Sequence, residues 1–154
     1  MKITLIGTLP PIKALSPYCY HLAEALSKKI DVDFINFNNL LPNFWYSGGF
    51  KEKKSYSFSN FKTSNIINWY NPLSWIKAGF KTDGEIVHFQ HWQLYASAMY
   101  CFILPIVKIR GKKRIVTIHN ITPHTADKAS ILLDKIFNKI IFPFTDFFIV
   151  HNNR

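Results

Sequence analysis

The chain has 154 residues, enough for one domain with a core of its own and too few for two. Hydrophobic residues make up 48% of it and charged residues 18%, a balance that excludes a disordered chain. The formal net charge of +10 indicates affinity for anions, but without zinc-finger spacing, an RNP pattern or a base-reading basic helix we expect no nucleic-acid partner.

Short apolar runs alternate with helical patterns along the chain, which predicts an α/β domain with a mainly parallel sheet. We therefore expect one Rossmann-like three-layer domain over residues 1–154. Strands are predicted at residues 2–7, 32–37, 66–69, 85–90, 114–119 and 147–150, with a further short one near 56–58. Helices are predicted at residues 17–30, 72–81, 93–110 and 127–142.

Proline marks the boundaries of these helices. Ser16 before Pro17 predicts an N-cap and a first helical residue, and Asn71 before Pro72 opens the second helix. Pro105 is expected to bend or break the third helix. Residues 86–107 contain no Lys, Arg, Asp or Glu and are long enough for a membrane-spanning helix. Their polar residues, and the alternation of polar and apolar residues at the start, favour a strand followed by a buried helix instead.

The two cysteines and the N-terminal residues indicate the cellular compartment of the protein. Cys19 and Cys101 lie far apart in apolar helical stretches, which predicts buried free thiols in a reducing compartment. The apolar run at the N-terminus is too short for a signal peptide. We therefore expect a cytoplasmic protein, and the basic and aromatic residues leave peripheral contact with a membrane surface open.

Polar side chains follow several of the predicted strands. Five of the six histidines lie at these strand ends, and ligands bind at the carboxyl ends of strands in open parallel sheets. The polar groups either mark the places where the backbone leaves the core or converge on a cleft suited to sugar hydroxyls, and we favour the cleft. The candidates are Lys13, Ser16, His88, Gln90, His91, Trp92, His119, Asn120, Thr122, His124, His151, Asn152 and Asn153.

These positions do not match the common catalytic motifs. The histidines lack the helical i, i+4 spacing of a zinc pair and have no carboxylate or thiol near them in sequence, so no metal is expected. The chain has no Gly-x-Ser-x-Gly elbow, no Walker lysine loop and no Gly-x-Gly-x-x-Gly. The helix that begins near Ser16 could face an anion or be an ordinary capped helix, and both interpretations stay open.

The order and spacing of three segments resemble the N-terminal domain of family-4 glycosyltransferases of the GT-B fold. The first segment is the opening strand, the Pro-Pro loop and SPYCYHLAEALSKKIDVDFINF. The second, EIVHFQHW, resembles the family's fourth-strand segment, and the third, KKRIVTIHNITPH, contains the family's His-Asn pair. The resemblance spans residues 1–152.

In this family two Rossmann-like domains face each other across a cleft, and the resemblance makes the present chain the acceptor-side half. It implies that His119 is the catalytic residue beside the transferred sugar, and that Asn120 and the loop from Lys13 to Ser16 contact substrate. His88, His91 and His124, taken from the strand-end pattern, complete the predicted substrate-binding set. A nucleotide-sugar would be the donor substrate, with no cofactor, and the partners would be a sugar acceptor and a separate donor-binding domain.

Two departures from the family pattern limit this implication. Ala14 stands where the family usually has a glycine that allows close approach to phosphate. The donor-binding domain, with its paired-glutamate motif, is absent, so we expect a truncated domain with no turnover by this chain alone. Apolar surface left without its usual cover would favour a homodimer.

Two other functions stay open from the sequence. The chain could be a non-catalytic module that binds carbohydrate, an anionic membrane surface or a partner protein through the basic, aromatic segment Phe44–Phe61. A basic nucleic-acid binder is a weaker alternative, and a steep salt dependence of RNA or DNA binding would be its sign.

Overall fold

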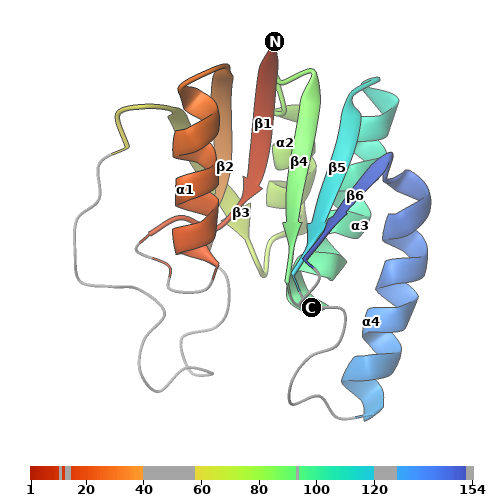
Figure 1. The fold of residues 1–154 in the computed structure, drawn as a ribbon. Helices are drawn as coiled ribbons and strands as arrows, with labels where there is room; N and C mark the ends of the chain where they lie inside the picture. The colour runs from red at the N-terminus through yellow and green to blue at the C-terminus, as the bar shows by residue number, and fades with distance from the viewer. Residues whose placement is uncertain (11, 13–14, 40–57, 93, 120–127, 152–154) are drawn as a thin grey trace.

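The fold is taken from a computed structural model, which describes residues 1–10, 12, 15–39, 58–92, 94–119 and 128–151. Six strands form one sheet in the order β3-β2-β1-β4-β5-β6, and every neighbouring pair is parallel (Figure 1). The parallel sheet predicted from the sequence is therefore confirmed. The strands are β1 (Lys2–Gly7), β2 (Asp31–Asn39), β3 (Lys62–Asn68), β4 (Ile86–His91), β5 (Lys113–Ile118) and β6 (Phe147–Val150).

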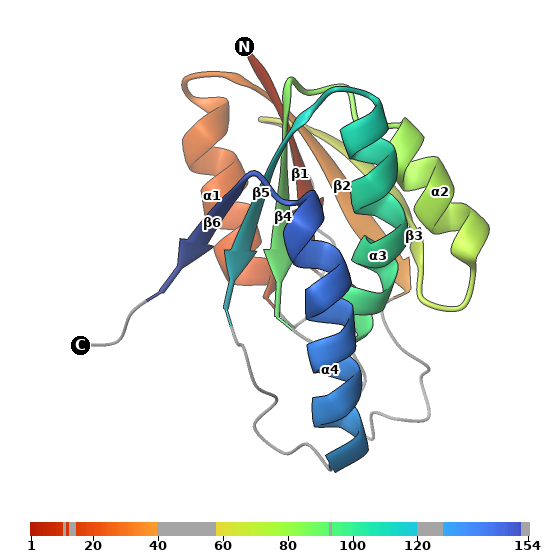
Figure 2. The same ribbon diagram turned by 90° about the vertical axis from the view of Figure 1, so that its right-hand side faces the viewer.

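Helices cover the sheet from both sides. Figure 2 shows α1 (Ser16–Ser27) on one side, and α2 (Pro72–Phe80), α3 (Leu94–Ile109) and α4 (Lys128–Ile141) on the other. A single-turn 3₁₀ helix, η2 (Phe142–Phe144), joins α4 to β6. Helix, sheet and helix therefore form the three layers of a Rossmann-like fold, as predicted.

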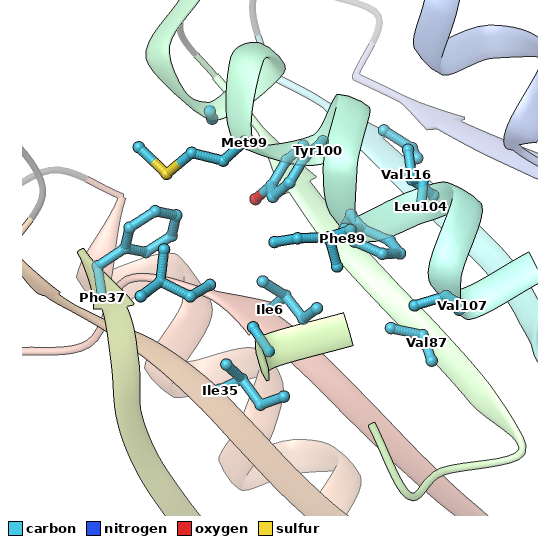
Figure 3. Packing of buried hydrophobic residues seen from close by; sticks show 14 of the residues in the cluster. Ile6, Ile35, Phe37, Val87, Phe89, Met99, Tyr100, Leu104, Val107 and Val116 are labelled. Carbon is cyan, nitrogen blue, oxygen red and sulfur yellow. The ribbon is translucent and has the colours of Figure 1, made fainter. Parts of the chain in front are cut away.

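The larger part of the core lies between the sheet and α3. Val87 and Phe89 of β4 and Val116 of β5 point to this side, because alternate residues of a strand face opposite sides of the sheet. They pack against side chains of α3 that are themselves fully buried, as Figure 3 shows for Tyr100 and Leu104. A run of buried apolar side chains on α3 is what the sequence predicted for residues 93–110.

Two strand predictions match the structure at their bounds, β1 and β6. The prediction for β3 was too short, because this strand begins at Lys62 rather than Ile66. Its first residues are polar and read as a turn. They remain extended because β3 is an edge strand that pairs only with β2, and Asn36 of β2 donates a side-chain hydrogen bond to Asn65 at 2.9 Å. Phe58 is not in a strand, and residues 56 and 57 lie outside the described residues.

The two helix-boundary predictions had different outcomes. Asn71 caps α2 as predicted, because its side chain accepts a hydrogen bond from the Leu73 amide at 3.1 Å. The N-cap prediction for Ser16 was wrong: Leu15 is the N-cap of α1, and no side chain caps it. The Ser16 hydroxyl instead donates to the carbonyl of Ile12, whose own amide bonds to Leu9 in the turn before the helix. The local turn has used the hydroxyl that would otherwise cap the helix.

Pro105 does not break α3, which continues through it from Leu94 to Ile109. Proline removes one hydrogen bond from a helix interior, at a cost of about 3 kcal/mol. The flanking side chains of Leu104 and Val107 are fully buried, and their packing offsets that cost. Among the described residues, no helix is long and apolar enough to cross a membrane. Cys19 is buried and Cys101 is half-buried, and both are free thiols.

Arg114 joins the edge strand β6 to the rest of the sheet. Its guanidinium donates to Asp146 at 2.5 Å, to the Phe144 carbonyl at 2.6 Å and to the Lys112 carbonyl at 2.7 Å. Its backbone amide donates to the same carboxylate at 2.8 Å. These bonds hold the turn that leads into β6, whereas the four side chains of β6 are themselves exposed.

Replacing Arg114 with Met should destabilise the domain by about 3 kcal/mol, because the Asp146 carboxylate loses its ion-pair partner in a partly buried site. The neighbouring Lys113 is exposed, so Lys113→Met serves as the matched control and should change stability by less than about 0.5 kcal/mol. Urea unfolding followed by circular dichroism measures both. Equal midpoints for the two variants would contradict the anchoring role of Arg114.

Candidate functional site

The face of the sheet under α1 is apolar at one side and polar at the other. Ile3 and Leu5 of β1 pack against α1, whose side chains Cys19 and Ala23 are buried in the same cluster. Further along the same face, β4 and β5 carry polar side chains instead. Together with rings from α1 and from the residue after β6 they form what we call the His119 cluster: Tyr18, His88, Gln90, Thr117, His119 and His151.

A continuous chain of hydrogen bonds joins four members of this cluster. Thr117 Oγ1 lies 2.6 Å from His88 Nε2, and Gln90 Nε2 lies 3.2 Å from the same nitrogen. Gln90 Oε1 lies 2.9 Å from His119 Nε2. The register of β4 on β5 creates these contacts, because Gln90 sits directly opposite Thr117. This series of hydrogen bonds leads from the fully buried hydroxyl of Thr117 to the half-buried imidazole of His119 at the carboxyl edge of the sheet.

Aromatic rings enclose His119 at this edge. The Tyr18 ring of α1 meets the His119 ring edge-on, with 4.7 Å between centroids. The His151 ring stacks on His119 at 5.1 Å, and Tyr18 also contacts His151 at 5.6 Å. Two segments that are distant in sequence, α1 and the residue after β6, therefore flank the His119 ring. Tyr18 is the second residue after Ser16 in α1, so the first turn of the helix is what brings it here.

Burial keeps His88 and His119 uncharged at physiological pH. Burial lowers the pKa of His88 to about 4, with a smaller contribution from His119. Burial likewise lowers the pKa of His119 to about 4, with smaller contributions from His151 and His91. Burial raises the pKa of Tyr18 above its usual value. Within the described residues, the hydrogen bonds of His88, Gln90 and His119 run to neutral groups and to no carboxylate.

Gly7 makes room for Gln90 at the end of β1. A Cβ atom at this position would lie 3.0 Å from Cys19 Sγ and 3.1 Å from Gln90 Cγ, which is closer than ordinary van der Waals contact. The absence of a side chain therefore lets the Gln90 side chain lie flat between β1 and β5. On the other side of the strand, the Tyr100 hydroxyl donates to the Gln90 carbonyl at 2.7 Å. Gln90 is 1% exposed and is fixed on both sides.

The structure brings some of the predicted site residues together and separates others. His88 and His119 belong to the cluster. His91 is buried, but its Nε2 pairs with Ser97 Oγ of α3 at 2.7 Å, on the opposite face of the sheet. Ser16 is buried with its hydroxyl bonded to Ile12. Three further predicted residues, Lys13, Asn120 and His124, lie outside the described residues, as does most of the segment Phe44–Phe61.

Two members of the cluster were missed by sequence reasoning. Tyr18 was assigned to the helical stripe of α1, and Thr117 was read only as part of an apolar strand. The period-2 alternation of a strand could have found Thr117, since it places this residue on the same face as His119. Tyr18 had no such signal, because nothing local indicates which ring of a helix reaches a strand end.

A second polar surface lies away from the cluster, between the edge strand β3 and α2. This open groove has a volume of about 490 Å³ and no side chain of the His119 cluster lines it. Lys77 and Lys81 lie along its helical side, and Asn65 and Asn68 along its strand side. Within the described parts of the chain, no three metal-ligating side chains are grouped so that they could hold an ion.

Gly7→Ala should destabilise the domain by about 1–3 kcal/mol, because Cys19 or Gln90 must move to admit the new methyl group. A double-mutant cycle with Cys19→Ala, which removes the nearest atom, tests this cause. The second substitution should recover part of the loss, so that the two effects are not additive in urea unfolding. Strict additivity would contradict the close packing of Gly7 against Cys19.

The lowered pKa of His88 predicts a pH dependence of stability. Between about pH 6.5 and pH 4 the unfolded chain binds a proton at this histidine and the folded chain does not, so stability rises with pH across that window. The full contribution, about 3 kcal/mol, is present above pH 6.5 and is lost progressively as the pH falls toward 4. His88→Gln should flatten the slope of unfolding free energy against pH, whereas the exposed His21→Gln should not.

An unchanged slope in His88→Gln would contradict a buried neutral His88. The comparison is made by urea unfolding at several pH values between 4.5 and 7.5. Differences between the variants cancel the titration of the carboxylates, which all of them share.

The sequence was also compared with known proteins. No protein-family model matches the chain, and no curated protein matches it. What this site does is therefore inferred from its own geometry and from the motif resemblance.

Proposed function

We propose that this chain is the acceptor-side domain of a family-4-like glycosyltransferase, and that the His119 cluster binds hydroxyl groups of a sugar. One observation carries the proposal: neutral hydrogen-bonding groups, rather than charged ones, are joined in a network at the carboxyl edge of a parallel sheet. Open α/β sheets bind ligands at this edge. Sugar hydroxyls both donate and accept hydrogen bonds, which suits imidazole, amide and hydroxyl partners.

The rings beside His119 support the same ligand class. Tyr18 and His151 present aromatic surface next to polar groups, and small-molecule sites combine apolar walls with a few placed polar atoms. A charged ligand would gain little here, since His88 and His119 remain uncharged at physiological pH. Dense positive charge elsewhere on the chain, at a net +10, suits the phosphates of a donor that a second domain would hold.

The lowered pKa of His119, about 4, favours one role for this residue. A general base works best when its pKa lies near the working pH, and His119 lies well below it. We therefore assign His119 to positioning and hydrogen bonding beside the transferred sugar. In the transfer itself, the acceptor oxygen would bond to the anomeric carbon while the bond to the nucleotide diphosphate breaks, with the acceptor proton released.

His119→Ala should weaken sugar binding about tenfold, the loss expected for one hydrogen bond of about 1.4 kcal/mol. Ligand-observed NMR with a panel of neutral mono- and oligosaccharides measures this binding in the chain as it stands. His21→Ala is the matched control, because His21 is exposed on α1 away from the cluster, and it should bind like the wild type.

Transfer is tested by mixing the chain with donor-binding domains of family-4 enzymes and a panel of nucleotide-sugars. Turnover that appears only in the mixture and is lost in His119→Ala supports the glycosyltransferase proposal. Sugar binding without turnover in any pairing would leave a carbohydrate-binding module. Binding to anionic liposomes with no sugar binding would overturn the proposal in favour of a membrane-surface role.

A further inference from the structure

Gln90 lies between the two histidines on the α1 face of the sheet. Its Oε1 is 2.9 Å from His119 Nε2, and its Nε2 is 3.2 Å from His88 Nε2. An amide oxygen can only accept a hydrogen bond, and an amide nitrogen can only donate one. In this orientation His119 Nε2 must carry a hydrogen, and His88 Nε2 must not. One glutamine therefore sets opposite tautomers on two neighbouring imidazoles.

The backbone and the stem of the Gln90 side chain are held by buried contacts. Its side chain passes over Gly7, where even a methyl group would lie 3.1 Å from Gln90 Cγ. Its backbone carbonyl accepts from the buried Tyr100 hydroxyl at 2.7 Å. Thr117, fully buried on β5, fills the space opposite and reaches the same His88 nitrogen as the Gln90 amide. These contacts fix the backbone and the stem of Gln90, and its amide presents the oxygen to His119 and the nitrogen to His88.

His119 gains a defined chemical preference from this arrangement. A neutral imidazole has one donor nitrogen and one acceptor nitrogen. With Nε2–H bonded to Gln90, the lone pair of Nδ1 is the acceptor of the His119 ring. Such a lone pair accepts a hydrogen bond from a hydroxyl and repels an oxygen that can only accept, such as an ether or an ionised phosphate oxygen. The rings of Tyr18 and His151 flank His119, and Gln90 is its partner in the sheet.

We propose that Gln90 is a positioning residue that holds His119 in the Nε2–H tautomer, so that His119 selects a hydroxyl-bearing ligand through Nδ1. The identity of that ligand as a sugar rests on the proposed function, whereas the tautomer does not. Gln90 need not touch the ligand to act in this way. Its effect passes through the 2.9 Å contact with His119.

The tautomer is measured directly by NMR of the ¹⁵N-labelled chain at pH 7.5, through the ring nitrogen shifts and their couplings to the ring carbon-bound hydrogens. The wild type should show a single Nε2–H tautomer for His119. Gln90→Met removes both hydrogen-bonding groups at similar volume, so His119 should become a mixture of tautomers. Gln90→Glu keeps an acceptor facing His119 and should restore the Nε2–H form. His21, which is exposed, is the internal reference.

An Nδ1–H tautomer of His119 in the wild type would overturn the proposal even if every variant failed to fold. So would a Gln90→Met protein that keeps the Nε2–H form unchanged. These outcomes need no ligand, and they are therefore separate from the outcome of the sugar-binding experiments.

The ligand preference is tested with the sugar that the wild type binds best and with its deoxy or methyl-ether analogues at each hydroxyl in turn. One analogue should lose about tenfold in affinity against the wild type, the value of one hydrogen bond, and should show no such loss against His119→Ala. Gln90→Met should lose a similar factor toward the parent sugar, and Gln90→Glu should recover it. Sugar binding unaffected by Gln90→Met would overturn the selecting role. No sugar binding by the wild type would refute the proposed function, while the tautomer result stands.

Discussion

A polar side chain that is buried in the face of a parallel sheet must be hydrogen-bonded, and this constraint governs how the two faces of this sheet differ. An unpaired buried hydroxyl, amide or imidazole costs about 1–3 kcal/mol. On the α3 face, Val87, Phe89 and Val116 are apolar, and the buried His91 pairs with Ser97. On the α1 face, β4 and β5 bring their polar residues into register, and each becomes the partner of the next. The hydrogen-bond network of His88, Gln90 and Thr117 therefore depends on the pairing of β4 with β5 as well as on the residue types.

The network also explains the small and aromatic residues around it. Gly7 is required because Gln90 lies across the end of β1, and Tyr100 reaches through from the other side to satisfy the Gln90 carbonyl. Tyr18 and His151 then close the edge around His119. When the side chains that would contact a ligand are themselves held by neighbouring side chains, the site is preorganised. A ligand then does not have to order these side chains when it binds. Such preorganisation is what the proposed role of His119 as a selective hydrogen-bond partner requires.

The sequence predicted the class of fold and the order of its elements, because alternating apolar runs and helical stripes record which surfaces are buried. It failed where tertiary contacts outweighed local preference. Pro105 remains inside α3 because the helix buries side chains from Ala96 to Val107. Lys62 to Asn65 form part of β3 because a strand at the edge of the sheet needs only one neighbour, here β2. The cap at Ser16 failed because a turn at Ile12 used its hydroxyl first.

The site was predicted in part, and for a clear physical reason. The rule for parallel sheets located His88, His91 and His119 at one edge. It did not separate the two faces, and the alternation of β4 turns His91 to the opposite face, where it pairs with Ser97. The position of Tyr18 depends on how α1 is placed on the sheet, and the hydrogen bonds depend on the register between β4 and β5. The local sequence indicates neither the placement of α1 nor the register of the two strands.

The edge strand β6 has a consequence for how copies of the chain behave in solution. Phe147, Phe148, Ile149 and Val150 are all exposed, and an uncovered apolar edge strand can add to the sheet of another molecule. The net charge of +10 opposes this contact by repulsion between copies. Repulsion between surface charges fades beyond a Debye length, which shrinks from about 30 Å at 0.01 M salt to about 10 Å at 0.1 M. Added salt therefore weakens the repulsion that would oppose pairing of two copies through β6.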